Sequence, residues 1–459
     1  MCPTVEIRVP RCNVMASYSR TAERRLNYIV LLLLISSFGP YVFPELGVRL
    51  EQIVIYSLFV LLIMGRLLSI GSPGLNSHLL TLAALLGLTI VWTSLPTFFG
   101  EHPRMSVERV VSGIERFSRP AATILIFALA TRSIETRGLR YSLRLSCLVA
   151  CVLVALNSVL CVTQVFVDTW PVAQFFLRPE ETQDQSKGLW QVCVSVGRYS
   201  GIFMQPFENG VAHSIGIMAW IYYASCSRKV SVALWVLLGL VTIGGLLSIS
   251  KAFLFGGISV GLVYLLLSSP GRRIFSWKVA LPAVASAVAL EEVFDTWKGT
   301  SDLMRFFVES DYEMDTLSRF TGARFSSGGS IILDYFETIW NAEPFLGFGF
   351  GYDHGFPFDN AWLEFFAQGG LFALSIYCLV LVLLGRLAAR GWEQRQQEGS
   401  LLIALWILVI GCGFGAPMLT LNRSSTVLWV LVSLCIVIIS SSPALRNEVQ
   451  REATNPSSD

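Results

Sequence analysis

The run LNYIVLLLLISSFGPYVF, from Leu26 to Phe43, contains no charged residue and only a few polar ones. An α-helix needs about 20 predominantly apolar residues to cross the hydrocarbon core of a bilayer. Comparable runs recur along the whole chain, for example from Leu401 to Ile410. The first run therefore predicts a membrane-spanning helix, and its recurrence predicts a polytopic integral membrane protein.

The composition supports the same prediction. The chain has 459 residues, of which 53% are hydrophobic and only 14% charged, and its mean hydropathy is +0.60. A soluble domain carries about 25% charged residues. The net charge of +2 gives no basis for nucleic-acid binding. Most of the ten cysteines lie inside apolar runs without CxxC or metal-ligand spacing, so we expect buried thiols rather than disulfides or a metal site.

The hydrophobic pattern predicts an all-α fold with about twelve transmembrane helices. Their centres are expected near residues 35, 60, 88, 123, 154, 218, 239, 259, 284, 374, 407 and 432. The predicted order is a basic tail at 1–25, spans at 26–165, a loop at 166–210, spans at 211–291, a large loop at 292–358, spans at 359–441 and a tail at 442–459.

The distribution of basic residues predicts the orientation. Cytoplasmic connections of membrane proteins carry an excess of Lys and Arg. The N-terminal tail and every second connection are basic here, so both termini are predicted to be cytoplasmic and both long loops extracytoplasmic. The residues concerned are Arg8, Arg11, Arg20, Arg24, Arg25, Arg66, Arg132, Arg137, Arg140, Arg144, Arg228, Lys229, Arg272, Arg273, Lys278, Arg386, Arg390 and Arg395.

Any chemistry is then expected outside the cytoplasm or within the membrane, because the predicted cytoplasmic connections are short and contain no P-loop or GxGxxG motif. The segment GFGFG looks like a phosphate-binding glycine loop, but no strand precedes it and it faces outside. A flexible loop re-entering the membrane is the favoured interpretation.

That segment belongs to LGFGFGYDHGFPFDNAWLEFFAQGG, Leu346–Gly370. Asn360, Glu364 and Gln368 follow at helical spacing, so they share one face of the predicted tenth span. A carboxylate inside the membrane costs about 2.5 to 3.5 kcal/mol on insertion scales, so it normally faces a wet cavity or a partner. Alternatively, the helix end lies at headgroup level with Asp359 or Asn360 as its N-cap. The two interpretations are compatible.

Isolated polar residues occur at the outer side of the predicted bundle. Each loop arginine taken alone is most simply a solvated surface charge. Several long basic side chains around one outer-leaflet cavity would instead suit a lipid-linked diphosphate, because Arg binds phosphate oxygens bidentately. The residues are Arg178, Arg198, Arg305, Arg319, Arg324, Lys251 in the turn SISKAF, and His213 in the first turns of the sixth span.

Three stretches resemble the O-antigen ligase and O-antigen polymerase superfamily of bacterial membrane glycosyltransferases. Members of that family have a proline-containing glycine turn, a variable loop, then His-Asn, a few apolar residues, an acidic residue and a glycine. AEPFLGFGFG is similar to the turn and DNAWLEFFAQGG to the membrane entry. RYSGIFMQPFENG, from Arg198, is similar to the family's Arg-Gly-Phe-Pro stretch, and SISKAF to its Ser-Arg turn.

The sequence also departs from that pattern. The family histidine is Asp359 here, and the acidic position falls on Gln368, with Glu364 one turn earlier. The family arginine of the Ser-Arg turn is Lys251, and Arg324 lies further from the glycine turn than usual. His354 is the nearby imidazole, outside the matching position.

The resemblance implies glycosyl transfer from an undecaprenyl-diphosphate-linked oligosaccharide on the outer leaflet of the bacterial inner membrane. Such chemistry needs a base for the acceptor hydroxyl and fixed cations for the leaving diphosphate, with no metal or other cofactor required. Asp359 or His354 is then the candidate base, with Glu364 as a further catalytic candidate. The candidate diphosphate ligands are Arg198, Lys251, Arg324 and Arg319, and the candidate cavity-lining residues are Asn360, Gln368 and His213.

Two jobs exist within that family. A polymerase joins lipid-linked repeat units, and a ligase moves the finished glycan to a lipid or protein acceptor. The missing family histidine favours a polymerase of O-antigen, capsule or exopolysaccharide, for which a chain-length-regulating co-polymerase is a conceivable partner. A transporter, such as a flippase for the same lipid, is the alternative from another class; its usual internal repeats are not evident here. No soluble signalling domain supports a sensor or scaffold.

Overall fold

The computed structural model describes residues 11–67, 75–99, 107–132, 134–177, 190–227, 229–267, 331–350 and 360–441. This part of the chain is helical apart from one small antiparallel hairpin, β1 (Tyr41–Phe43) and β2 (Val48–Arg49), in which Tyr41 pairs with Arg49. The predicted all-α class is confirmed. The helices are α1 (Arg11–Ser37), α2 (Leu50–Leu67), α3 (Ser77–Phe99), α4 (Val107–Ala130), α5 (Thr136–Phe166), α6 (Trp170–Ala173), α8 (Pro206–Ser225), α9 (Val232–Leu247), the π-helix η1 (Ala252–Ser259), α10 (Val260–Leu267), α15 (Ile331–Ala342), α16 (Ala361–Glu393), α17 (Gln397–Gly413) and α18 (Asn422–Ser440).

Four of the described helices, α3, α5, α16 and α18, are long and apolar enough to cross a membrane. Shorter apolar helices occur at Val232–Leu247, Ala252–Leu266 and Gln397–Gly413. Each predicted span centre falls within a described helix except the one near residue 284, which lies outside the described residues. The molecule therefore has the helices of a membrane protein, and the count of twelve spans stays a prediction.

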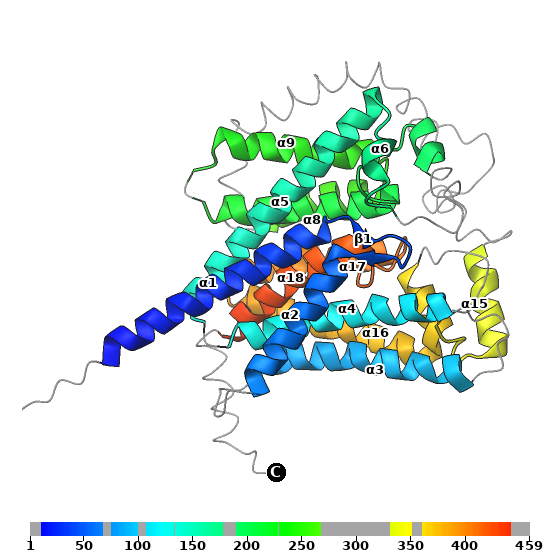
Figure 1. Ribbon diagram of the computed structural model, residues 1–459, viewed down its shortest axis with the longest axis horizontal. Helices are drawn as coiled ribbons and strands as arrows, with labels where there is room; N and C mark the ends of the chain where they lie inside the picture. The colour runs from blue at the N-terminus through cyan, green and yellow to red at the C-terminus, as the bar shows by residue number, and fades with distance from the viewer. Residues whose placement is uncertain are drawn as a thin grey trace, which may run out of the picture.

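Helix α18 lies at the centre of the bundle. Its side chains are buried on every face from Arg423 to Ile439, as expected for a helix that is apolar all round and enclosed by others. It packs against α1, α4, α5, α8 and α17. Figure 1 shows α3, α4 and α16 side by side in one part of the bundle and α8 and α9 in the other, with α1 and α18 between them.

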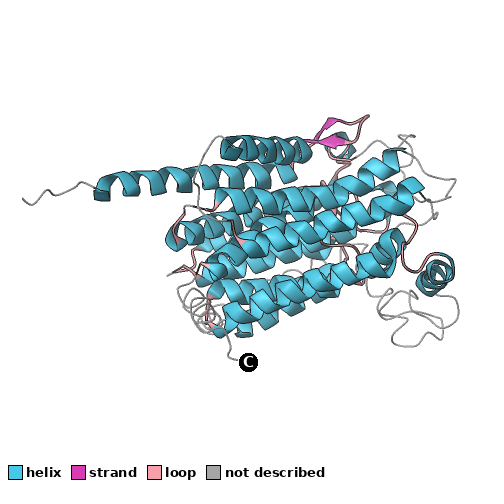
Figure 2. Ribbon diagram, turned by 90° about the horizontal axis from the view of Figure 1, so that it is seen from below, coloured by secondary structure: helices cyan, strands magenta, loops and turns pink. Residues whose placement is uncertain are grey.

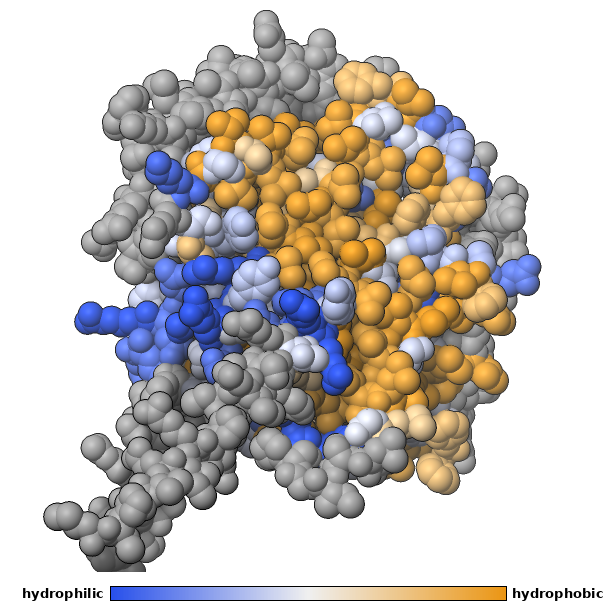
Figure 3. Space-filling model, turned by 60° about the vertical axis from the view of Figure 1, so that its left-hand side comes forward, coloured by the Kyte–Doolittle hydropathy of each residue, from blue (hydrophilic) through white to orange (hydrophobic). Residues whose placement is uncertain are grey.

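Several of the described basic connections lie at one end of the bundle. Partial burial and the charge of Arg66 both lower the pKa of Arg132 from its ordinary value, which places the α2 and α4 ends together. Arg140 at the start of α5 pairs with Glu398 at the start of α17, with 3.1 Å between Nε and Oε1. Figure 3 shows hydrophilic residues gathered around this end, beside a broad hydrophobic surface. The alternation of basic connections along the whole chain and their cytoplasmic location stay predictions, because Arg228, Arg272, Arg273 and Lys278 lie outside the described residues.

The opposite end carries the hairpin, α6, α15 and the turn before α16 (Figure 1). Figure 2 shows α15 end-on while the long helices lie across the view, so α15 runs across the bundle rather than along it. Asn360 and Glu364, two of the residues that the sequence singles out, belong to the start of α16 at this end.

Candidate functional site

Helix α16 is broken at a glycine pair. Gly369 has φ −136° and ψ 19°, and Gly370 has φ 63° and ψ −159°, both outside the helical region. The conformation of Gly370 is open almost only to glycine. A Cβ at this position would also lie 2.2 Å from the Phe345 carbonyl oxygen. The predicted tenth span therefore begins as a short helical segment, Ala361–Gln368, before the main helix continues.

The glycine turn packs directly on this break. The N–H groups of Phe348 and Gly349 donate to the carbonyls of Ala367 and Gln368 at 2.7 and 2.9 Å, and Leu371 N–H donates to the Pro344 carbonyl at 2.8 Å. Backbone groups released by a helix break need such partners in an apolar environment. The turn and the break therefore form one hydrogen-bonded unit.

The same contacts decide between the interpretations of GFGFG. Gly347 and Gly349 have φ of 68° and 79°, and a Cβ on Gly347 would lie 2.6 Å from Gly370 N. The N–H of Gly347 donates to the Glu343 carbonyl and that of Phe350 to Thr97 Oγ1 at 2.6 Å. These N–H groups are used within the protein, so this is no phosphate cradle. Its described glycines allow close packing, and the flexibility of this loop stays a prediction.

Asn360 begins α16 as its N-cap. Its side-chain oxygen accepts hydrogen bonds from the N–H groups of Trp362 at 2.8 Å and Leu363 at 3.1 Å. One turn on, Glu364 is fully buried, and Gln368 follows on the same face. Of the two N-cap candidates, Asn360 has this role, and the three polar residues share a buried face.

Glu364 is paired with an arginine that the sequence analysis did not select. Arg116 Nη1 on α4 lies 2.7 Å from Glu364 Oε1. The Arg116 side chain is 42% exposed, whereas that of Glu364 is 0% exposed. Thr420 Oγ1 and Gln368 Nε2 also approach the carboxylate, at 3.4 and 3.5 Å. The buried carboxylate thus holds a cation that reaches the surface.

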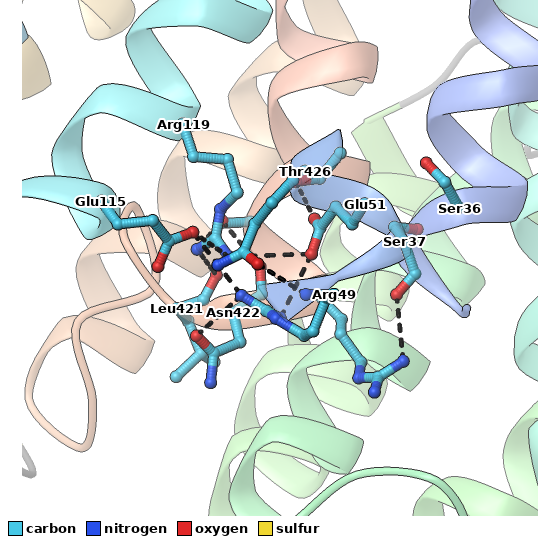
Figure 4. Close-up of polar contacts among 12 residues, drawn as sticks. Ser36, Ser37, Arg49, Glu51, Glu115, Arg119, Leu421, Asn422 and Thr426 are labelled. Carbon is cyan, nitrogen blue, oxygen red and sulfur yellow. Dashed lines mark hydrogen bonds and ion pairs between the residues drawn. The ribbon is translucent and has the colours of Figure 1, made fainter. Parts of the chain in front are cut away.

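Two further charges on α4 lie in a buried ionic cluster (Figure 4). Arg119 Nη1 is 3.4 Å from Glu115 Oε1 and 3.7 Å from Glu51 Oε2. Arg49 on β2 lies 3.2 Å from the same Glu51 oxygen and 3.7 Å from Glu115 Oε1. Burial acts to lower the pKa of Arg49, but Glu51 and Glu115 outweigh it, so its pKa is raised and the residue stays charged.

Helix α18 completes this cluster. Arg119 Nη2 donates to the carbonyls of Thr420 at 3.2 Å and Leu421 at 3.3 Å, and Thr426 bonds to Glu51. Arg423 N–H donates to Glu208 on α8 at 3.0 Å, and its guanidinium donates to the Gly39 carbonyl at 2.6 Å. Arg49 and Arg119 are therefore ion-paired with Glu51 and Glu115, and Arg116 with Glu364. Arg423 differs, because Glu208 accepts from its backbone N–H while its guanidinium donates to backbone carbonyls.

His213 lies in a separate buried polar cluster. Its Nε2 is 2.9 Å from Ser158 Oγ on α5, and its Nδ1 is 2.8 Å from the Asn209 carbonyl on α8. Asn209 in turn accepts from Asn157 at 2.8 Å. Both ring nitrogens of His213 bind within the helix bundle, so its described contacts join α5 to α8 and do not reach Glu364.

The segments that contain Arg198 and Lys251 lie together. Tyr199 N–H donates to the Leu247 carbonyl at 2.9 Å, which joins the loop after Arg198 to the turn before Lys251. Asn209 Nδ2 also donates to the Tyr199 carbonyl at 3.1 Å. The stretch that begins at Arg198 and the turn SISKAF therefore lie side by side, because Leu247 directly precedes that turn.

Asp359, His354, Arg319 and Arg324 lie outside the described residues. The residues that flank the segment with His354 and Asp359 are both described. Phe350 packs against Gly113 and against Phe117, with 5.9 Å between the ring centroids of Phe117 and Phe350. Asn360 begins the helical segment that contains Glu364, the partner of Arg116. Phe350 therefore packs on α4 itself, and Asn360 lies one helical turn before Glu364, the partner of Arg116.

No protein-family model matches the chain, and a search of curated proteins finds no match.

Proposed function

We propose that the protein is a membrane glycosyltransferase that polymerises polyprenyl-diphosphate-linked oligosaccharide repeat units into a surface polysaccharide. The proposal places its site at the loop end of the bundle, on the outer face of the bacterial inner membrane, with both termini in the cytoplasm. It rests on the resemblance of three stretches and on one structural observation. Arg116, a cation with 42% of its side chain exposed, is held by buried Glu364 next to both flanks of the segment that contains His354 and Asp359.

The chemistry assigns different roles to the carboxylates. Glu364 is ion-paired and fully buried, so it is better suited to hold Arg116 than to accept a proton from a sugar hydroxyl. Asp359 or His354 is the proposed base. A guanidinium is always charged and binds diphosphate oxygens bidentately, so Arg116 is proposed as a diphosphate ligand. Arg198, Lys251, Arg319 and Arg324 are the other proposed ligands.

The first experiment is a deletion of the protein in its native cells. Surface polysaccharide is sized on a gel, and lipid-linked oligosaccharides are extracted from the same cells. Loss of long chains, with single repeat units still reaching the final acceptor, supports a polymerase. Long chains left on the polyprenyl carrier identify a ligase instead.

A transporter of the same lipid-linked oligosaccharide is the second candidate function, because the break in helix α16 is a feature of transporter substrate sites. Discontinuous helices form the substrate sites of many transporters. In this protein the released backbone groups of α16 bond to Phe348, Gly349 and Pro344, so they are already occupied. Repeat units trapped on the cytoplasmic leaflet in the deletion strain would identify a flippase and remove the glycosyltransferase proposal.

Point variants then test the site in cells that express equal amounts of protein. Asp359→Asn and Arg116→Gln are expected to abolish or strongly shorten the polymer. Arg25→Gln is the matched control, because Arg25 is an exposed arginine near the opposite, basic end. Full-length polymer with Asp359→Asn would remove Asp359 from the mechanism, and the same result with Arg116→Gln would remove Arg116.

A further inference from the structure

Helix α15 has two chemically different sides. Its sequence IILDYFETIWNA places Tyr335, Phe336, Ile339 and Trp340 on one side at helical spacing. Asp334, Glu337, Thr338 and Asn341 lie on the other side and are exposed. The helix is therefore amphipathic, and its polar side carries acidic but no basic residues.

The apolar side of α15 is only partly covered by the bundle. Ile339 is buried against Leu363 and Phe366 of the short first segment of α16. Phe336 stacks on Phe366, with ring centroids 4.8 Å apart, and on Trp340 at 5.9 Å. Even so, 42% of Phe336 and 49% of Trp340 remain exposed. Two large rings are thus fixed by stacking at the edge of the molecule, with their outer faces uncovered.

The uncovered rings continue an apolar surface that runs along the long helices. On α3 the exposed residues recur on one stripe, at Leu88, Val91, Leu95, Phe98 and Phe99. On α16, Phe372 and Leu379 are exposed, and Phe372 packs against Trp92 of α3 with ring centroids 4.0 Å apart.

Phe345 and Leu346, both exposed, lie between α15 and the turn that binds Thr97 of α3. Exposed side chains are mainly aliphatic along the middle of α3 and aromatic at its α15 end. Trp and Tyr concentrate at the level of the lipid headgroups in membrane proteins, and Trp, Phe and Leu form the apolar face of helices that lie in the membrane interface. On the described surface, the exposed side chains change from mainly aliphatic to aromatic at the level of α15.

We propose that α15 lies in the membrane interface, with Phe336 and Trp340 inserted at the boundary between headgroups and acyl chains. Its orientation across the bundle is that of a helix lying in the membrane plane (Figures 1 and 2). The exposed acidic residues then face water. Because α15 has no basic residue, the partner is a lipid surface with neutral or zwitterionic headgroups, bound through apolar contact rather than through charge attraction.

With α15 in the membrane interface, the depth of the adjacent glycine turn and helix break in the membrane is also fixed. Phe366, on which Phe336 stacks, belongs to the helical segment that bonds to the glycine turn. The turn, the break in α16 and Glu364 are therefore held close below the headgroup level. The inference does not depend on the proposed enzymatic activity.

The test uses the full chain reconstituted in phosphatidylcholine vesicles. A photoreactive phenylalanine analogue replaces Phe336 or Trp340 in turn, and the matched control positions are Glu337 and Thr338 on the other side of the same helix. After irradiation, mass spectrometry of the α15 peptide distinguishes lipid adducts from protein crosslinks. Lipid adducts at positions 336 and 340, at least fivefold above positions 337 and 338, are the expected result.

Two outcomes would overturn the inference. Crosslinks from positions 336 and 340 to the α16 peptide that contains Phe366 are expected from the stacking, but crosslinks to any other peptide of this chain would show that another segment covers the rings. Equal or absent lipid adducts at the four positions would show that α15 does not lie in the interface. Replacement of part of the phosphatidylcholine by phosphatidylglycerol is expected to leave the yield unchanged or to lower it, and a severalfold increase would contradict binding through apolar contact. Each readout is independent of glycan synthesis, so its failure differs from failure of the proposed function.

Discussion

Removal of Arg116 is expected to destabilise the protein more than removal of its partner, although both changes break the same ion pair. Glu364 is fully buried, whereas 42% of the Arg116 side chain is exposed. In Arg116→Gln the carboxylate loses its cation and keeps Thr420 and Gln368 at 3.4 and 3.5 Å. Leaving one buried charge unpaired costs about 3 to 5 kcal/mol, and access of water at Arg116 places this variant near the lower value.

Replacement of Glu364 leaves Arg116 as the group without its ion-pair partner. In Glu364→Gln the unpaired group is the exposed guanidinium, which water can solvate, so the expected cost is about 1 kcal/mol. The two single variants should therefore differ by about 2 kcal/mol. The double variant Arg116→Gln/Glu364→Gln should be close to Glu364→Gln alone, because it contains no buried unpaired charge.

The assay is a denaturant titration of the purified protein in one detergent, with all three variants and the wild type in a double-mutant cycle. Arg25→Gln, an exposed arginine at the other end of the bundle, serves as the control and should stay within about 0.5 kcal/mol of the wild type. Equal losses in the two single variants would refute the reasoning from unequal burial. A double variant as unstable as the sum of the single variants would show that the two side chains do not interact.

Three further changes test other parts of the structure. Gly370→Ala should lower the free energy of unfolding by about 3 kcal/mol or more, because Gly370 has a φ of 63° and a Cβ there would meet the Phe345 carbonyl. Gly411→Ala is the control and should be neutral in the same titration, because Gly411 has open space around it. Equal effects of the two changes would contradict the helix break. Asn360→Ala should cost about 1 kcal/mol through loss of the N-cap, and Asn360→Asp should retain most of the stability; equal losses would exclude the cap. Burial raises the pKa of the Cys193 thiol and the charge of Arg198 opposes this rise, so Arg198→Gln should raise the pKa further and slow alkylation of Cys193 near neutral pH. The difference in alkylation rate should disappear at a pH above the thiol pKa of both the wild type and the variant, where Cys193 is ionised in each. An unchanged pH profile would show that Arg198 does not act on the Cys193 thiol.

The features that depend on local sequence could be predicted. An N-cap at Asp359 or Asn360 and a shared face of Glu364 and Gln368 were predicted from capping chemistry and helical spacing, and the structure has the cap at Asn360 and the shared face. The helix positions also follow, because hydrophobic runs and basic connections are local signals. The break at Gly369–Gly370 was not predicted, although a glycine pair inside a helical pattern is a local signal for an interruption.

The ionic cluster was harder to predict because its partners lie far apart in the chain. Arg116 and Glu364 are separated by 248 residues, and nothing in either neighbourhood indicates the other. The charges themselves were a signal, since IERFSRP places Glu115, Arg116 and Arg119 within a predicted span. Identifying α2, α16 and α18 as the partners required the packing of the bundle.

The distance along the chain between α4 and its partners matters for biosynthesis. Arg119 binds the carbonyls of Thr420 and Leu421, and its contact with Ser425 joins residues 306 positions apart. An arginine near the centre of a helix opposes membrane insertion by about 2.5 to 3.5 kcal/mol, so α4 is a poor candidate for stable insertion by itself. Until α18 has been synthesised, Arg116 and Arg119 of α4 depend on water, headgroups and the carboxylates Glu51 and Glu115. The buried contacts of α4 are therefore completed only when α18 has been made. A chain that stops before Asn422 should be a substrate for membrane quality-control proteases.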